Sequence, residues 1–511
     1  MLVELADLDA VLALHATLVD APLAGIHEIV PAARTLMLRF DPAHWSRHTL
    51  TAALAQRDLS IATSDRGPLI EIPMRYDGED LAEIAQLCGL SIKEVIRRHG
   101  AREYTVAFCG FSPGFGYLVG GDPMLQVPRR STPRTRVPAG SVALGGVYCG
   151  VYPQASPGGW QLIGTTSMPM WDVERTTPAI LTPGTRVKFV ERDSGPAVEI
   201  TAKEKSLVEP YLTVTAAALP ALVQDLGRPG HAAIGVTASG ALDRGSLRTA
   251  NAAVGNPLEL AALEITFGNF AFEIFGAAEI ALAGAAVPIT VTRASGELFE
   301  AAMQDAIGLH SGDRVKLGYP PRGVRTYLAA RGGFDAPKIL GSASSDVLAA
   351  LGPAPLVKGS IVSIGRVPLE RTTTVSKPGP VAQHAMPTLP KSNDVVVLDI
   401  FAGPRADWFS SNALEHFCTQ VWQVTPRSNR VGLRLHGETP LTRQRTDELP
   451  SEGLTNGAIQ VPHDGQPVLL LADHPVTGGY PVIAIVAEHH LDLAGQIPPS
   501  AKIRFRLLAD P

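Results

Sequence analysis

Residues 108–118 read Phe108-Cys-Gly-Phe-Ser-Pro-Gly-Phe-Gly-Tyr-Leu118, so that aromatic residues alternate with glycine and proline. Short apolar runs broken by Gly and Pro continue in this way from Tyr104 to about Phe189. Such spacing is typical of short strands joined by tight turns, and it predicts a single β-barrel or sandwich. Over the whole chain, 49 Gly and 42 Pro favour many turns and short strands over long helices.

Two segments with helical patterns precede this β-rich part of the sequence. Asp77 is expected to cap the first helix, and Gly89 to end it. Ser91 then opens a second helix that ends near His99-Gly100. We therefore predict that residues 76–195 form one unit, in which two helices accompany the barrel.

The N-terminal residues 1–75 are predicted to form a small α+β domain. Residues 35–40 alternate like a strand, and Trp45 to Leu59 has the pattern of a helix. Leu69 to Pro73 looks like another strand, stopped by its proline.

Two polar, turn-rich stretches divide the rest of the chain. The first linker is placed at 196–210 and the second at 371–394, because neither has enough apolar residues to support a core. The expected lobes are 211–370 and 395–511. Limited proteolysis is expected to cut first around the two linkers.

The chain contains one weak internal echo. Pro138–Gly146 is followed by Ser156–Gly164, and near the end Asn456–Pro462 is followed by Val476–Ile483. Each pair joins a Gly-centred strand to a later Gly-Gly-aromatic turn. Two related barrels explain this pattern, and chance repetition in a Gly-rich chain is the alternative.

Composition excludes several classes of partner. The 511 residues are 45% hydrophobic and 18% charged, with a net charge of −5, so nucleic acid and anionic membranes are not expected as partners. The N-terminus carries acids where a signal peptide needs Lys or Arg. The most apolar stretch, Phe272 to Val291, contains Glu273 and Glu279 and is too polar to span a bilayer. A cytoplasmic location is expected.

No cofactor motif stands out. The four cysteines form no Cys-x-x-Cys pair and are expected to be buried thiols, and the histidines show no zinc-ligand spacing, so no metal is predicted. No phosphate loop, no nucleotide-binding Gly-x-Gly-x-x-Gly, no Gly-x-Ser-x-Gly elbow and no Met-Lys-Met biotinylation site appears. If ATP binds, these motifs do not reveal where, and the chain itself is expected to carry no biotin.

The first half resembles the B subunit of 5-oxoprolinase, a family also described as allophanate hydrolase subunit 1 and as the kinase inhibitor KipI. The resemblance rests on the block 108–118 and on two later blocks, Val127-Pro-Arg-Arg-Ser-Thr-Pro-Arg-Thr-Arg-Val-Pro-Ala-Gly-Ser-Val142 and Tyr152-Pro-Gln-Ala-Ser-Pro-Gly-Gly-Trp160.

The second half resembles the C subunit, also described as allophanate hydrolase subunit 2 or KipA. The matching blocks include Val223-Gln-Asp-Leu-Gly-Arg-Pro-Gly230, Ser239-Gly-Ala-Leu-Asp243, Tyr327-Leu-Ala-Ala-Arg-Gly-Gly-Phe334, Ser428-Asn-Arg-Val-Gly-Leu-Arg-Leu435 and Thr477-Gly-Gly-Tyr-Pro481. The first-half block carries Ser112 and Gly116 at positions that vary in the family, and the second half departs from the family pattern at two sites. Thr237-Ala238 replaces a usual proline, and Arg331 replaces a usual small residue.

The resemblance implies a mainly β protein with cyclophilin-like barrels: one in the first half, behind the α+β part, and a two-lobed pair in the second. It also implies the B plus C part of ATP-dependent 5-oxoprolinase, which activates the lactam amide of 5-oxoproline for ring opening to glutamate with a separate A subunit. One alternative is a carboxyltransferase related to that of urea carboxylase, served by a biotin carboxylase partner. The other is a KipI/KipA-like regulator of a histidine kinase. A homo-oligomer is possible in each case.

Candidate site residues in the first half fall into three groups. Arg129 and Arg134 are candidates for holding a carboxylate or phosphate through paired donors, and a solvated basic loop is the alternative. The aromatic residues of 108–118 are candidates for walling a pocket for a flat amide, and a tightly packed barrel corner is the alternative. A run with consecutive backbone N–H groups is a candidate anion nest, with a plain turn as the alternative. The pocket and nest candidates are Phe111, Phe115, Tyr117, Ser156, Gly158, Gly159 and Trp160.

In the second half, acids and arginines recur beside glycines. A carboxylate beside a Gly-Gly turn can accept from a urea-like NH₂, so Asp473 is a candidate for orienting an amide and Arg430 for meeting negative charge. Structural ion pairs are the alternative for both. The further candidates for substrate binding are Asp225, Arg228, Arg405, Arg434, Thr477, Gly478, Gly479 and Tyr480.

Overall fold

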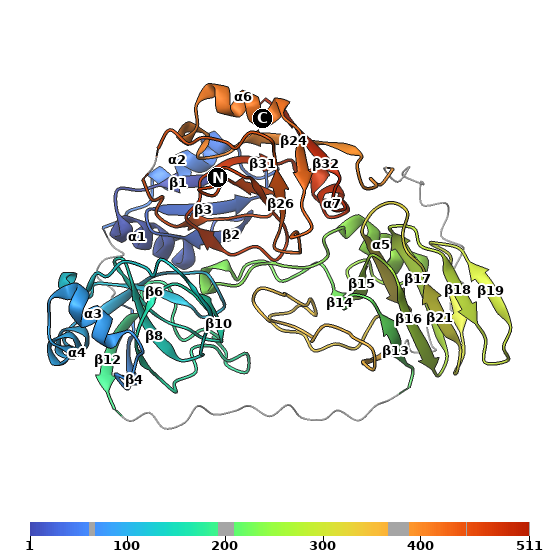
Figure 1. The fold of residues 1–511 in the computed structure, drawn as a ribbon, viewed down its shortest axis with the longest axis horizontal. Coiled ribbons are helices and arrows are strands. Elements are labelled where there is room, and N and C mark those ends of the chain that lie inside the picture. Colours follow the sequence, from blue (N-terminus) through green and yellow to red (C-terminus); the bar gives the residue numbers. More distant parts are fainter. Residues whose placement is uncertain (61–66, 193–208, 366–387, 446, 510–511) are drawn as a thin grey trace.

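The computed structural model describes residues 1–60, 67–192, 209–365, 388–445 and 447–509. We call its parts the N-terminal unit (1–60), the first barrel (67–192), the two-sheet lobe (209–365) and the second barrel (388–445 with 447–509) (Figure 1). The mainly β architecture is confirmed. The predicted linkers at 196–210 and 371–394 lie mostly outside the described residues.

The N-terminal unit is a three-stranded antiparallel sheet, in the order β1-β3-β2, packed against two helices. Its core joins buried leucines of β3 to the apolar face of α1. Ser46 caps α2 through a capping box with Thr49. The elements are β1 (Leu2–Glu4), α1 (Leu8–Asp20), β2 (Ile26–Pro31), β3 (Thr35–Phe40) and α2 (Arg47–Ala55).

The first barrel is a seven-stranded sheet in the order β11-β8-β9-β6-β5-β12-β4, and a bridge between Arg75 and Thr165 nearly closes it. Its strands are β4 (Leu69–Met74), β5 (Tyr104–Cys109), β6 (Gly116–Val119), β8 (Ser141–Gly145), β9 (Tyr148–Val151), β11 (Gln161–Thr165) and β12 (Arg186–Glu191). A separate two-stranded antiparallel sheet is formed by β7 (Arg134–Val137) and β10 (Ser156–Gly158).

One predicted strand changes unit. The strand at 69–73 does not belong to the N-terminal unit, because β4 pairs in parallel with β12 of the first barrel. Pro73 does not stop it either. An edge strand tolerates a proline, which cannot donate to a ladder, and β4 is the last strand in the sheet order.

The helices of the first barrel begin close to where the sequence predicts them, with one correction. Gly89, at φ +66°, ends α3 (Leu81–Cys88), and Ser91 caps α4 (Ile92–Ala101) as predicted. Asp77 does not cap α3. Its carboxylate accepts from the Thr165 hydroxyl at 2.8 Å, and Asp80 occupies the cap position.

The two-sheet lobe contains a six-stranded sheet, β19-β18-β21-β16-β13-β23, facing a five-stranded sheet, β14-β15-β22-β17-β20, around one apolar core. The predicted pair of barrels in the second half is therefore one closed barrel and one pair of facing sheets. The elements are β13 (Tyr211–Ala217), β14 (Leu222–Gln224), η3 (Ala232–Ile234), α5 (Arg244–Ala253), β15 (Ala262–Thr266), β16 (Phe270–Phe275), β17 (Ala278–Gly284), β18 (Ile289–Thr292), β19 (Leu298–Ala301), β20 (Ile307–Leu309), β21 (Arg314–Leu317), β22 (Arg325–Ala330) and β23 (Ile361–Ser363).

The second barrel is closed, in the order β24-β31-β28-β29-β26-β25-β32. Its strands are β24 (Val395–Ala402), β25 (Trp422–Val424), β26 (Gly432–His436), β28 (Ala458–Gln460), β29 (Val468–Leu470), β31 (Val482–Val486) and β32 (Lys502–Leu507). A separate two-stranded antiparallel sheet is formed by β27 (Glu452–Gly453) and β30 (Thr477–Gly478), and the helices are α6 (Ser411–Thr419) and α7 (Leu491–Ala494).

The two barrels share one topology. The strand order of the second barrel is that of the first with each strand replaced by its counterpart. The counterparts of β4, β5, β6, β8, β9, β11 and β12 are β24, β25, β26, β28, β29, β31 and β32. In each, the last strand pairs in parallel with the first, and a separate two-stranded antiparallel sheet accompanies the barrel. The repeated sequence segments fall on corresponding elements, so the interpretation of the echo as two related barrels is confirmed. No helix among the described residues is long and apolar enough to cross a bilayer.

Candidate functional site

Loops from three units meet at one place. The loop between β5 and β6 docks on the two-sheet lobe, where the N–H of Gly114 donates to the carbonyl of Ile234 at 3.2 Å. The same loop touches the second barrel so closely that a Cβ on Gly110 would lie 2.0 Å from Oγ1 of Thr477. Phe111 adopts φ +64°, which is unusual for a bulky residue and marks local strain at this junction.

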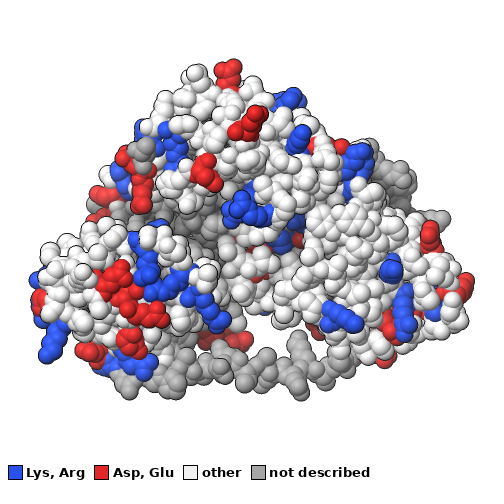
Figure 2. All heavy atoms as spheres, viewed as in Figure 1, with Lys and Arg blue, Asp and Glu red and all other residues white. Residues whose placement is uncertain are grey.

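A polar cavity of about 200 Å³ lies beside this junction. The N-terminal unit supplies Glu28 from β2 and Arg39 from β3, and the two-sheet lobe supplies the segment 237–239 and Arg244. The second barrel closes the remaining wall, with Asn456, His474 and Glu488 among its residues. Figure 2 shows acidic and basic side chains together in the hollow between the three lobes.

Both arginines of the cavity are available to a ligand. Neither Arg39 nor Arg244 makes a side-chain hydrogen bond or an ion pair with the described residues. Burial lowers the pKa of Arg244, and the nearby charge of Arg39 lowers it further. Two such guanidinium groups facing one small cavity suit an anion, because carboxylates and phosphates accept paired donors from arginine.

Two further side chains in the wall are polar and largely enclosed. His474 is 8% exposed, and its Nδ1 lies 2.8 Å from the carbonyl oxygen of Pro475. Burial lowers the pKa of His474, so the ring is neutral near pH 7. Burial also raises the pKa of Glu28, against the pull of Arg39 and of the amides of Gly230 and Ala232.

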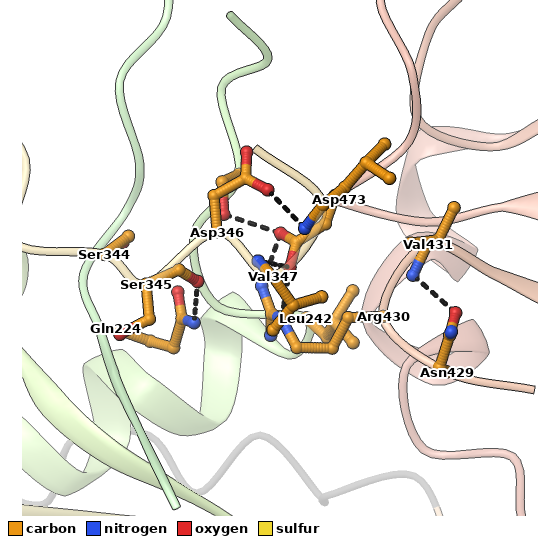
Figure 3. Close-up of polar contacts among 12 residues, drawn as sticks. Gln224, Leu242, Ser344, Ser345, Asp346, Val347, Asn429, Arg430, Val431 and Asp473 are labelled. Carbon is orange, nitrogen blue, oxygen red and sulfur yellow. Dashed lines mark hydrogen bonds and ion pairs between the residues drawn. The ribbon is translucent and has the colours of Figure 1, made fainter. Parts of the chain in front are cut away.

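A buried ion-pair network around Arg430 and Asp473 (Figure 3) adjoins the cavity through Ser239. Arg430 forms a paired contact with Asp473, at 2.8 Å from Nε to Oδ2 and 2.9 Å from Nη2 to Oδ1, and its Nη1 donates to Glu264 at 2.6 Å. Ser239, which lines the cavity, donates to Asp473 at 2.6 Å. The network thus fixes the cavity segment 237–239 to the second barrel.

The charges of this network stabilise one another. Burial would lower the pKa of Arg430, but Asp473 and Glu264 outweigh it and raise that pKa. Burial would raise the pKa of Glu264, but Arg430 and Arg325 lower it. Nearby Asp346 has its pKa raised to about 6, first by burial and then by the charge of Asp473. Both oxygens of Asp473 are occupied, since Oδ2 also accepts the N–H of Val347 at 3.1 Å.

The two predicted arginines of the first half do not line the cavity. Arg134 pairs with buried Asp80 at 2.7 Å and with Glu79 at 3.3 Å, so it joins β7 to the start of α3. Arg129 is exposed and makes no hydrogen bond or ion pair with the described residues. Figure 2 shows the resulting group of mixed charges on the first barrel.

The predicted aromatic wall is mainly a packed core. Phe115 and Trp160 are buried at a ring-centre distance of 5.5 Å, and Tyr117 stacks on Phe108 at 4.4 Å. Only Phe111 of this group is exposed. The expected anion nest at Ser156, Gly158 and Gly159 is also different, because residues 156–158 form β10 and pair with β7, while the carbonyl of Gly159 accepts from the N–H of Arg130.

The predicted residues of the second half mainly make structural hydrogen bonds and ion pairs. Asp225 accepts from the hydroxyls of Ser342 and Ser344, and Arg228, fully buried, donates to the carbonyls of Ile339 and Ser344. Together they tie the turn after β14 to the segment 339–345.

Other predicted residues lie at edges or interfaces. Arg405 pairs with Glu452 and with Glu4 of the N-terminal unit. Arg434 is exposed on β26. Thr477 and Gly478 form β30, Gly479 follows them, and Tyr480 is exposed with its ring 5.6 Å from that of His463. Of the residues predicted to be catalytic, Arg430 and Asp473 come together beside the cavity, and Arg129 and Arg134 do not.

The residues that line the cavity were missed by sequence reasoning. Arg244 directly follows the family block 239–243, and His474 directly follows the candidate Asp473. Their positions next to these residues were the available signal. Glu28 and Arg39 lie on strands in another unit, and no motif marks them. The residues meet only through tertiary packing.

Among the described residues, one group of side chains has the spacing of metal ligands. Asp399, His489 and His490 bring ligand atoms within 4.8 Å of one another. Arg506 already occupies both oxygens of Asp399, at 2.5 and 2.8 Å, and its hydrogen bond is the main cause that lowers the pKa of this carboxyl to about 2. A guanidinium in this position opposes a cation, so we assign no metal there.

The fold and the cavity define a β-rich protein in which paired domains of one chain enclose a polar site. Residues 2–181 match the family model of the carboxyltransferase domain, subdomain C and D, and residues 234–507 match that of subdomain A and B. The chain therefore belongs to the carboxyltransferase-domain family, and it carries both pairs of subdomains.

Relatives of the two halves occur as separate proteins. The C subunit of Escherichia coli 5-oxoprolinase is 34% identical over 302 residues, which are 58% of this chain and 90% of that protein. The B subunit of the enzyme from E. coli O157:H7 is 43% identical over 183 residues, 35% of this chain and 83% of that protein. The resemblance to fused B and C subunits is confirmed.

Two solved structures extend this comparison. That of TTHA0988 has a TM-score of 0.83 and 34% identity, and covers 99% of both chains. That of Kluyveromyces lactis urea amidolyase has a TM-score of 0.53 and 30% identity; it covers 60% of this chain, which spans 19% of that much longer protein.

Proposed function

We propose that this chain is the B plus C component of an ATP-dependent 5-oxoprolinase and acts with a separate A subunit. The observation that carries the proposal is the shared cavity. Glu28 and Arg39 come from the half related to the B subunit, whereas Arg244 and His474 come from the half related to the C subunit. Joining both halves in one chain makes this composite site permanent.

The proposed chemistry is activation of a lactam. The γ-phosphoryl group of ATP is transferred to the lactam carbonyl oxygen and ADP leaves. One water then adds to the activated carbon and the C–N bond breaks, with the nitrogen taking up a proton, to give a γ-glutamyl phosphate. A second water hydrolyses this acyl phosphate to glutamate and phosphate. Phosphorylation of the oxygen removes the amide resonance and makes the carbonyl carbon more electrophilic, so water adds to it more readily. Guanidinium groups such as those of Arg39 and Arg244 favour the negative charge of this substrate and its transition state.

The test is reconstitution. The purified chain is incubated with 5-oxoproline and ATP, first by itself and then with a separately purified A subunit, and glutamate is measured. We expect glutamate only when all three of ATP, the A subunit, and the chain are present. Robust glutamate formation by the chain alone removes the partner requirement, and no glutamate in the complete mixture rejects the proposal.

A second candidate is carboxyl transfer to a urea-like substrate. The carboxyltransferase family and the similarity to urea amidolyase favour it. A biotin carboxylase partner supplies the carboxyl group in this case. Urea-dependent loss of the carboxyl group from carboxybiotin, measured with this chain and without the A subunit, identifies this reaction and distinguishes it from lactam opening.

A further inference from the structure

The two arginines of the cavity contact no acidic side chain in the described parts of the chain, although acids are near. Both oxygens of Asp492 accept backbone N–H groups, those of Arg244 at 2.9 Å and Gly245 at 3.0 Å, so this carboxylate serves the start of α5. Glu28 also lines the cavity, and it forms no ion pair with an arginine among the described residues. The guanidinium donors of Arg39 and Arg244 therefore remain available to a ligand.

The tautomer of His474 follows from its one hydrogen bond to the described residues. The carbonyl oxygen of Pro475 can only accept, so Nδ1 of the neutral ring carries the proton. Nε2 is then an acceptor, and it makes no hydrogen bond with the residues that the structure describes. The wall that His474 lines thus offers an acceptor for an N–H group.

We propose that the cavity binds a small carboxylic acid with an N–H group next to its carboxylate, the carboxylate held by Arg39 and Arg244 and the N–H accepted by Nε2 of His474. A lactam with a carboxyl group on the carbon beside nitrogen has this arrangement. The identity of the lactam rests on the proposed function, whereas the recognition of a carboxylate does not.

The proposal makes specificity a property of both halves. Arg39 belongs to the half related to the B subunit, whereas Arg244 belongs to the half related to the C subunit, so neither half alone holds the carboxylate with both arginines. These residues bind and orient the ligand. Nothing in this step forms or breaks a covalent bond.

Calorimetric titration of the full chain tests the proposal with three probes: 5-oxoproline, 2-pyrrolidinone, which lacks the carboxylate, and cyclopentanecarboxylate, which lacks the lactam. We expect Arg39→Gln and Arg244→Gln each to lower the affinity for 5-oxoproline by roughly 10- to 100-fold, the range for the loss of one charge-assisted hydrogen bond. Binding of 2-pyrrolidinone should not respond to these changes. His474→Gln should lower the affinity for 5-oxoproline, but it should change the affinity for cyclopentanecarboxylate by less than about twofold.

Two control variants test whether the charge of the cavity residues sets the affinity. Arg248→Gln removes an exposed charge one turn further along α5, outside the cavity, and should change affinity less than about twofold. Glu28→Gln removes a negative charge from the cavity wall and should increase the affinity for a carboxylate ligand. A lower affinity for the carboxylate overturns the proposal that the cavity favours anions. Melting temperatures show that each variant is folded, and exposed Arg39 is the safest position to change.

The outcomes separate this inference from the proposed function. Unchanged 5-oxoproline affinity in both arginine variants overturns the inference, even if the complete system makes glutamate. Failure of both carboxylates to bind also overturns it. Arginine-dependent binding of the carboxylates with no glutamate in the complete system supports the inference and rejects the proposed function alone.

Discussion

At the scale of single residues, Asp473 shows how a residue type can point to one role and its surroundings to another. A carboxylate beside a Gly-Gly turn suits amide recognition, but Asp473 is fully buried and its oxygens are taken by Arg430, Ser239 and the N–H of Val347. Its effect on the cavity passes through Ser239, so we assign it a positioning role.

We expect Arg430→Gln to lower the free energy of unfolding by about 3–5 kcal/mol, because the change leaves Asp473 buried without its paired cation and leaves Glu264 with Arg325 alone. Urea unfolding followed by fluorescence measures the loss. Arg434→Gln, an exposed arginine close in sequence, is the matched control and should stay within about 0.5 kcal/mol. Equal effects of the two changes contradict a buried network.

A second residue, His99, should make the first barrel sensitive to acid. It is fully buried, and burial lowers its pKa from 6.5 to about 3. Above pH 6.5 the folded and unfolded forms are both neutral there. Between pH 6.5 and 3 only the unfolded form takes up the proton, so stability falls by about 1.4 kcal/mol per pH unit.

Melting temperatures between about pH 8 and about pH 4 check this expectation. His99→Phe should flatten the decrease below pH 6.5, although it also removes the 2.9 Å contact between Nδ1 and the Tyr76 hydroxyl. Exposed His48→Gln should leave the pH dependence unchanged. An identical slope in the His99 variant assigns the acid sensitivity to other groups.

At the scale of elements, the two barrels repeat one strand order but use the corresponding loops differently. The loop between β5 and β6 of the first barrel docks across a domain boundary, whereas the corresponding segment between β25 and β26 carries Arg430 into the buried network. Glycine permits the docking, because Gly110 lies where any Cβ would meet Thr477.

We expect Gly110→Ala to destabilise the chain by about 1–3 kcal/mol, since the added Cβ would lie 2.0 Å from Oγ1 of Thr477. Thr477→Ala in the same chain should recover part of the loss, and a double-mutant cycle measures this coupling. Gly308→Ala is the control, because a Cβ there meets nothing within 4 Å. Simple additivity of the Gly110 and Thr477 changes contradicts a close contact between these two residues.

At the scale of the whole molecule, the half related to the B subunit is held to the half related to the C subunit through several contacts. Val30 and Met37 of the N-terminal unit pack with Ala232 and Val476 in one apolar cluster. The N–H of Ala33 donates to the carbonyl of Ser451 at 3.1 Å. These contacts hold the cavity together across the two halves.

Residues 1–195 and 209–511, produced as two chains, are therefore expected to associate and to elute together in size-exclusion chromatography. Val30→Asp places a charge in the apolar cluster and should separate them. Val19→Asp, at a position 57% exposed on α1, is the matched control and should leave the complex intact. Separate elution of the unmodified halves contradicts the interface.

The sequence by itself determined what depends on near neighbours. Ser91 and Gly89 mark helix ends because capping and left-handed backbone are local properties. The Gly-centred repeats marked two barrels because related strands need the same turns. The strand at 69–73 was assigned to the wrong unit, since pairing of β4 with β12 joins segments that lie far apart along the chain.

Only the tertiary structure decided the site. Arg39, Arg244 and His474 lie on three units, and their meeting depends on how apolar faces of separate domains pack. The same packing buried Arg430 with Asp473 and left Arg129 in solvent, although both arginines stand in similar polar, turn-rich stretches of sequence. Burial decides whether a charge must be paired or stays available, and burial is set by contacts that no local pattern records.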